Sequence, residues 1–128
     1  MKEKVMHLMR RGALTCVDDC SVRDVAQIMV VNSVRYCVIL NTEHEVVGII
    51  SARSILKAFG KDLDKTKAKD ILLPYTITIT PLYPLKDALE LMTRKKIEHL
   101  VVVSDRTGSK AVLGILHAAD VVIKMAHT

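Results

Sequence analysis

The sequence predicts a mixed α+β fold made of two similar units that pack together. The chain has 128 residues, which is enough for one domain or for two small units that share a core. Half of the residues are hydrophobic, a fraction that excludes a disordered chain. Segments with apolar residues at helical spacing alternate with short β-branched runs, and the second half of the chain repeats this order.

The internal repeat covers nearly the whole chain. A shift of 63 positions places residues 21–29 on residues 84–92, so that the apolar, Asp and Met positions agree. Further along the chain a shift of 66 places Gly48 on Gly114, because the second copy has three extra residues in its turn. The two predicted copies are residues 1–62 and 63–128.

Each copy is expected to begin with a short strand and a helix. The helices are predicted at residues 22–29 and 85–92, where apolar residues recur at helical spacing. Ser21 is expected to cap the first of these helices. Pro84 fits the first turn of the second, where a missing N–H costs nothing.

A β-hairpin and a closing helix complete each copy. Apolar runs separated by polar turns predict the hairpins, and Gly60 is expected to end the first closing helix. The charged segment 61–67 is expected to link the copies. The predicted hairpin strands are residues 36–40, 46–50, 100–103 and 111–116, and the predicted closing helices are residues 52–59 and 118–126.

Neither copy is expected to be stable alone. A unit of about 60 residues buries only about 60% of its surface. Packing the two copies against each other about a pseudo-two-fold axis would remedy this shortage. It would also create two related clefts between them.

The ordered set of segments resembles the CBS (cystathionine-β-synthase) domain, a family that occurs in tandem pairs. The resemblance covers about residues 4 to 126. It rests on the strand Thr, the Ala-containing helix that ends in Met, the Val-rich strand, and the segment that begins with Gly and two apolar residues. The resemblance implies β-α-β-β-α units with two clefts that hold adenosine-containing ligands. It also implies a regulatory role and dimerisation into a flat disc.

The residues that follow each hairpin suggest how a nucleotide would be held. A hydroxyl residue at a helix start and a carboxylate three residues later project to one side. Free N–H groups there favour a phosphate, and the carboxylate can accept two hydrogen bonds from ribose hydroxyls. Neither copy has the whole pattern. The first has the hydroxyl residue, Ser51, but Ser54 stands in place of the carboxylate. The second has the carboxylate, Asp120, but His117 stands in place of the hydroxyl residue.

The family resemblance assigns the candidate site residues one by one. Asp120 is expected to contact the ribose, and His117 with the backbone of Ala118 and Ala119 to contact the phosphate. Thr15, Thr78, Tyr36 and His99 stand where the family often contacts the base, and Ser51, Arg53 and Ser54 are candidates for a second cleft. Each of these side chains also has a purely structural interpretation, as a helix cap or as a strand residue with a satisfied polar tip.

The cysteine pattern and the composition do not favour a metal site, a disulfide, nucleic-acid binding or catalysis. The spacing of Cys16, Cys20 and Cys37 favours small buried core residues over a metal site or a disulfide. The net charge of +5 suits an anionic partner, and the basic clusters could focus positive potential on the clefts. Nucleic acid is disfavoured because one Phe, three Tyr and no Trp leave little on which bases could stack. We expect no enzyme and no catalytic cofactor, because neither a nucleophile with its base nor a Gly-rich phosphate loop is visible.

The sequence therefore predicts a regulatory module that binds AMP, ADP or ATP in the cleft between two repeats, with S-adenosylmethionine or NAD as further ligands to consider. A homodimer, an unidentified protein partner and a cytoplasmic location are also expected. No apolar run approaches the ~20 residues that a membrane-spanning helix needs. Two alternatives stay open, a nucleic-acid-binding protein and a purely structural or dimerisation pair with degenerate clefts.

Overall fold

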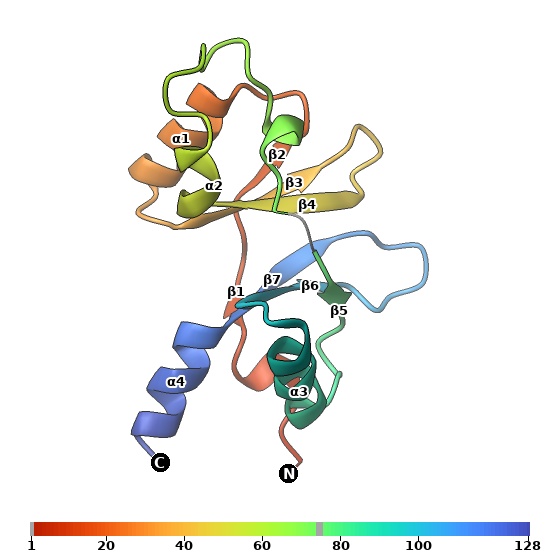
Figure 1. Ribbon diagram of the computed structural model, residues 1–128. Helices are drawn as coiled ribbons and strands as arrows, with labels where there is room; N and C mark the ends of the chain where they lie inside the picture. Colours follow the sequence, from red (N-terminus) through yellow and green to blue (C-terminus); the bar gives the residue numbers. More distant parts are fainter. Residues whose placement is uncertain (1, 74–75) are drawn as a thin grey trace. The chain divides into compact units, whose positions relative to one another are not determined.

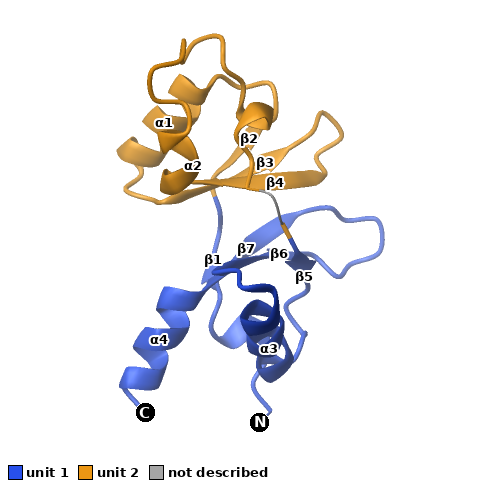
Figure 2. Cartoon of the chain, viewed as in Figure 1, with its two compact units in different colours: residues 1–13, 77–128 blue, residues 14–76 orange. Residues whose placement is uncertain are grey.

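The computed structural model describes residues 2–73 and 76–128, which form two compact units (Figures 1 and 2). Unit 1 consists of Met1–Ala13 and Ile77–Thr128, and unit 2 consists of Leu14–Thr76. Each unit has its own sheet and its own helices. The predicted mixed α+β fold of two repeats is confirmed.

Unit 2 contains a three-stranded sheet in the order β2-β3-β4. Strand β2 runs parallel to β3, and β3 forms the predicted antiparallel hairpin with β4. One face of this sheet packs on a core that includes Cys16, Cys37, Ile39 and Ile50. The elements of unit 2 are β2 (Thr15–Val17), α1 (Val22–Val31), β3 (Tyr36–Leu40), β4 (Val46–Ser51), α2 (Ala52–Leu56) and the 3-10 helix η2 (Ala68–Asp70).

Unit 1 contains a four-stranded sheet in the order β1-β7-β6-β5. Strand β5 runs parallel to β6, while β6–β7 and β1–β7 are antiparallel pairs. Its core includes Val5, Leu100, Val102 and Leu116. The elements of unit 1 are η1 (Val5–His7), β1 (Arg10–Arg11), β5 (Thr78–Ile79), α3 (Leu85–Lys95), β6 (His99–Val103), β7 (Val112–His117) and α4 (Ala118–Ala126).

The first helix of each repeat forms where the apolar spacing predicts it. Helix α1 begins after Ser21, whose Oγ accepts a hydrogen bond from the Asp24 N–H at 3.1 Å. This contact satisfies one of the N–H groups that a helix start leaves without a helical partner. Helix α3 begins after Pro84, which lies just before the first helical residue. The buried face of α1 is Val22, Val25 and Met29, and that of α3 is Leu85, Ala88 and Met92.

The closing helices differ in length. Helix α4 has the predicted bounds, but α2 ends at Leu56 instead of residue 59. Turns follow α2 as far as Gly60, whose φ of 87° is readily adopted by glycine. Gly60 therefore ends the turns that follow the helix, and the helix itself ends one turn earlier.

The first segment of each sequence copy lies in the unit formed by the rest of the other copy. Val5 is fully buried in the core of unit 1, and its N–H donates to the Tyr83 carbonyl at 2.9 Å. In unit 2, the Ala68 N–H donates to the Cys20 carbonyl at 2.8 Å in the same way. Unit 1 is thus built from two separate stretches of the chain, whereas unit 2 is one continuous stretch that runs from the first sequence copy into the second.

The segment 61–67, which was expected to link the two sequence copies, packs within unit 2 and does not join the two units. The Thr66 carbonyl accepts a hydrogen bond from the Val22 N–H at 2.8 Å, which fixes the segment to the start of α1. The chain instead divides between the units after Ala13 and after Thr76. The boundary between residues 62 and 63 concerns the sequence copies and stays a prediction. No helix in the described ranges has the length and apolar character needed to cross a membrane.

Candidate functional site

Three of the predicted site residues in unit 1 share one face of its sheet. His99 on β6 lies directly opposite His117 on β7. The residues next to them, Leu100 and Leu116, belong to the core. Since side chains alternate along a strand, His99 and His117 face away from that core. Thr78 on β5 does so as well, because its neighbour Ile79 is a core residue.

The start of α4 already satisfies two of the N–H groups that were predicted to hold a phosphate. The Ala119 N–H donates to Nδ1 of His117 at 3.0 Å, which makes the imidazole the cap of this helix. The Ala118 N–H donates to the Glu98 carbonyl at 2.8 Å. An anion at this position would have to replace acceptors that belong to the protein. The assignment of His117, Ala118 and Ala119 to a phosphate therefore stays a prediction.

The Asp120 carboxylate is held by Arg10, a residue to which the sequence assigned no specific partner. Nε of Arg10 donates to Oδ1 at 3.0 Å and to Oδ2 at 2.9 Å, and Nη2 donates to Oδ1 at 2.9 Å. The Asp120 side chain is 15% exposed, whereas the Arg10 side chain is 74% exposed. The hydrogen bonds to Asp120, followed by its charge, raise the pKa of Arg10, and slight burial opposes them.

No sequence pattern predicts this ion pair. Arg10 lies on β1, a strand of two residues that is too short to show an alternating pattern. Its register opposite Ile115 of β7 places it beside the start of α4. A basic residue matched to one carboxylate 110 positions away becomes visible only when the strand pairing is known.

His99 is buried, with only 6% of its surface exposed. Burial lowers its pKa, the neighbouring His117 lowers it further, and Glu98 acts in the opposite direction. Burial dominates because a charged imidazole loses its hydration in such a place. The His99 ring is thus held in its neutral form over a wider pH range than a free histidine.

The equivalent residues in unit 2 are arranged as a helix cap. Tyr36 on β3 lies opposite Ser51 on β4. The Ser54 N–H donates to Oγ of Ser51, and the Ser51 N–H donates to Oγ of Ser54, both at 3.2 Å. Ser54 is fully buried, while Thr15 and Arg53 are exposed. The capping interpretation of both serines is therefore observed, and their assignment to a second cleft stays a prediction.

The three cysteines contribute to the interior of unit 2. Cys16 and Cys37 are buried in its core, as predicted, and Cys20 is partly exposed beside it. Burial raises the pKa of Cys16, and the neighbouring thiols of Cys37 and Cys20 raise it further. Burial likewise raises the pKa of Cys37. Across residues 2–73 and 76–128, no group of three His, Cys, Asp or Glu side chains is arranged to hold a metal ion.

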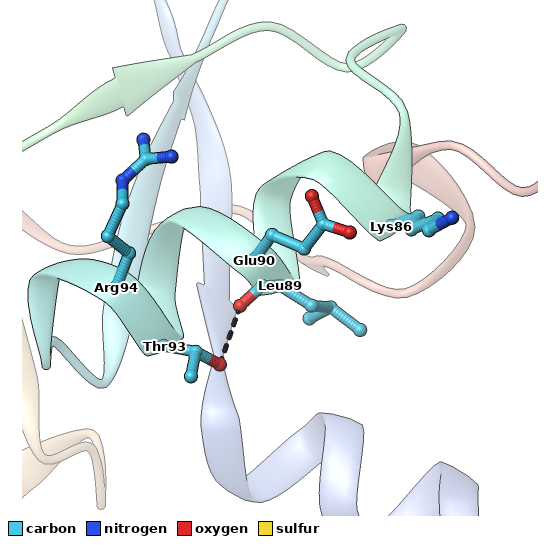
Figure 3. Close-up of a pocket in the computed structure, with 5 residues that line it drawn as sticks. All are labelled: Lys86, Leu89, Glu90, Thr93 and Arg94. Atoms are coloured by element: carbon cyan, nitrogen blue, oxygen red, sulfur yellow. Dashed lines mark hydrogen bonds between the residues drawn. The ribbon is translucent and has the colours of Figure 1, made fainter.

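A shallow pocket of about 390 Å³ lies on the outer face of α3 (Figure 3). Lys86, Leu89, Glu90, Thr93 and Arg94 line it. Within it, Oγ1 of Thr93 donates to the Leu89 carbonyl at 2.9 Å, a contact that fixes the side chain to its own helix. None of the predicted site residues lines this pocket, so it is separate from the candidate groups.

The fold and the two candidate groups define a class of protein. It is a paired-repeat α+β protein in which each unit places polar side chains at the ends of its hairpin strands and at the start of the following helix. The chain belongs to the CBS domain family, whose profile matches residues 5–61 and 68–127. The predicted tandem CBS pair is confirmed.

Two curated relatives are similar to the chain over most of its length. The mitochondrial CBS domain-containing protein CBSX3 of Arabidopsis thaliana is 30% identical over 121 residues, which cover 89% of this chain and 57% of the relative. The uncharacterized protein MJ0450 of Methanocaldococcus jannaschii is also 30% identical over 121 residues, which cover 90% of this chain and 62% of the relative. The chain thus spans roughly three fifths of the length of these relatives.

Solved CBS structures match the chain along almost its full length. The CBS domain pair of protein MJ0100, in complex with 5′-methylthioadenosine and S-adenosyl-L-methionine, has a TM-score of 0.83 at 21% identity and covers 99% of this chain and 98% of its own. The CBS domain protein PAE2072 from Pyrobaculum aerophilum, complexed with AMP, has a TM-score of 0.79 at 27% identity and covers 98% of this chain and 99% of its own. The first likeness supports the fold alone.

Proposed function

We propose that this CBS pair is a regulatory module that binds an adenine nucleotide, AMP, ADP or ATP, through the unit 1 group of Thr78, His99, His117 and Asp120. The observation that carries the proposal is the Asp120 carboxylate, which lies largely buried in the first turn of α4. A carboxylate in this position can accept hydrogen bonds from both hydroxyls of a ribose. The AMP held by PAE2072 supports this class of ligand.

The regulatory step would be a difference in affinity. A nucleotide that binds one arrangement of the chain more tightly than another shifts the population toward the first, and by no more than that difference. The candidate groups include neither an activated nucleophile nor a metal cluster among the residues described, so we propose signalling through binding instead of catalysis.

Titration of the full chain with AMP, ADP and ATP tests the proposal. Asp120→Asn keeps the shape of the side chain and removes its charge, and we expect its affinity to fall about tenfold, as for the loss of a charged hydrogen bond. Asp64→Asn is the matched control, because Asp64 also pairs with an arginine, Arg23, at 2.6 Å but belongs to no candidate group. Absence of nucleotide binding by the unmodified chain at millimolar concentrations would contradict the proposal.

The structural alternative is favoured by one observation. The N–H groups of Ala118 and Ala119 and the hydroxyls of Ser51 and Ser54 all have partners within the protein. If both groups are purely structural, no nucleotide will raise the melting temperature. A bound nucleotide at 100 times its Kd should instead stabilise the chain by about 2.7 kcal/mol.

We also propose that the chain forms homodimers through exposed apolar side chains on and just after its closing helices. Leu56 and Phe59 follow the unit 2 hairpin and are 72% and 92% exposed, and their sequence equivalents Val122 and Met125 are 62% and 66% exposed. Large apolar side chains exposed at matching positions are typical of a contact surface. Sedimentation should give twice the 14.2 kDa chain mass, and a single-chain mass would contradict the proposal.

The cytoplasmic location and a protein partner remain predictions.

A further inference from the structure

The ion pair between Arg10 and Asp120 occupies the carboxylate that the proposed function assigns to the ribose. The guanidinium makes three hydrogen bonds to the two carboxylate oxygens, all between 2.9 and 3.0 Å. A ribose diol needs the same oxygens as acceptors. Since a carboxylate has about four acceptor positions and Arg10 uses three of them, both hydroxyls of a ribose can bind Asp120 only if Arg10 is displaced.

The pair is present in unit 1 and replaced as a whole in unit 2. In unit 1, Arg10 lies opposite Ile115 of β7. At the equivalent place in unit 2, the Leu73 N–H donates to the carbonyl of Ile49 at 3.0 Å. Arg10 thus corresponds to Leu73, and Asp120 corresponds to Ser54 by the shift of 66. Both members of the pair therefore differ between the two units, and the ion pair is specific to unit 1.

Release of Arg10 from Asp120 is expected to cost little. The Arg10 side chain is 74% exposed, so its guanidinium is already largely hydrated in the ion pair and a surface pair of this kind contributes little free energy. Its backbone stays paired with β7 and holds the freed side chain beside the start of α4. A cation therefore remains near the carboxylate after the exchange.

A phosphate bound at this place needs a positively charged partner. The backbone N–H groups of Ala118 and Ala119 already donate within the protein. Arg10 is the cation that contacts Asp120, and its planar fork of N–H groups suits phosphate oxygens as well as a carboxylate. The displaced guanidinium is thus placed to bind the anionic part of the incoming ligand.

We propose that Arg10 is a selectivity residue that exchanges the Asp120 carboxylate for the phosphate of an adenine nucleotide, so that unit 1 prefers AMP over neutral adenosine. This inference rests on the proposed nucleotide binding by unit 1. Adenosine displaces Arg10 and gives it no new partner. AMP displaces Arg10 and binds it again.

The test compares AMP and adenosine by calorimetric titration of the full chain and of Arg10→Leu, which copies the residue found in unit 2. The variant should bind adenosine up to about fivefold more tightly, because the competing ion pair is gone. It should bind AMP about tenfold more weakly, because the charged contact to phosphate is lost. The preference for AMP over adenosine should therefore fall sharply.

Two further variants control the result. Arg11→Leu removes the same charge from the neighbouring residue of β1, which makes no ion pair in the structure as described, and should leave the preference unchanged. Arg10→Lys keeps the charge without the planar fork, so its preference for AMP over adenosine should lie between those of the unmodified chain and Arg10→Leu. It serves as the test if Arg10→Leu does not fold.

The outcomes separate the two proposals. If the unmodified chain binds both ligands and substitution of Arg10 leaves their ratio unchanged, the role of Arg10 is overturned and nucleotide binding stands. An equal change in Arg11→Leu overturns it as well, because general charge would then explain the preference. If the unmodified chain binds neither ligand, the role of Arg10 is overturned, and the titrations with ADP and ATP decide whether nucleotide binding stands.

Discussion

The burial of His99 makes the stability of unit 1 depend on pH. Its pKa in the folded chain lies below the ordinary value of 6.5. As the pH falls below about 6.5, the unfolded chain takes up a proton on this ring that the folded chain does not bind. The contribution of His99 to the free energy of unfolding is therefore fully present above this pH. It decreases as the pH falls, until the pH reaches the lowered pKa of the folded state.

We predict that His99→Gln reduces this loss of stability in acid. Glutamine is polar but has no titrating ring, so the variant should lose less stability than the unmodified chain between about pH 7.5 and pH 5.5. Urea unfolding at both values measures the difference. If the two proteins lose the same free energy, His99 is not the responsible group.

Two equivalent glycines, Gly48 on β4 and Gly114 on β7, lead to a prediction at the level of strands. A Cβ at Gly114 would collide with the carbonyl oxygen of Arg10, so β1 would have to move away from β7. For a Cβ at Gly48, the three nearest atoms all belong to the Leu72 side chain, at 2.9 to 3.2 Å. A flexible side chain can move aside more easily than a paired backbone.

We therefore expect Gly114→Ala to destabilise the chain by about 3 kcal/mol and Gly48→Ala by about 1 kcal/mol. Urea unfolding of the two variants measures both values. Each is the other's control, because the substitution is the same at equivalent positions of the repeat. Equal losses would show that β1 yields as readily as a side chain.

The elements that the sequence predicts well are those with a clear period or a long apolar run. Helices α1 and α3 follow from apolar positions three and four apart, and β3 and β6 from continuous apolar runs. Strand β1 and the 3-10 helices η1 and η2 have two or three residues each, too few to show a period. Their places depend on the pairing with distant segments.

The candidate site was only partly predictable for the same reason. The positions of His99, His117 and Asp120 relative to one another follow from the hairpin and the helix after it, and Thr78 joins them through the parallel pairing of β5 with β6. The partner of Asp120 comes from β1, whose register no local pattern specifies. Likewise, the hydrogen bond from Ala118 to the Glu98 carbonyl depends on the final geometry of the backbone.

For the whole molecule, the exchange of first segments predicts where a core mutation will act. Val5 belongs to the first sequence copy but is fully buried in the core of unit 1 with Leu100 and Leu116. Val5→Ala should destabilise unit 1 by about 2 kcal/mol through lost burial and the cavity left behind. Unit 2 contains none of these contacts.

Hydrogen exchange of the backbone amides can locate this effect. Protection should fall in β6 and β7 of unit 1 more than in β3 and β4 of unit 2. Val30→Ala is the control, because Val30 is 78% exposed on α1 and its loss should change little. A larger fall in unit 2 would contradict the assignment of the first residues to unit 1.

The same exchange bears on how such a chain could arise by gene duplication. An ancestor with a single copy would lack the segment that fills its core and borders its last strand, unless a second polypeptide supplied it, as in a domain-swapped dimer. Folding of that ancestor would then depend on protein concentration. Fusion of two copies into one gene places both segments on the same polypeptide, so that neither unit has to wait for an encounter with another chain.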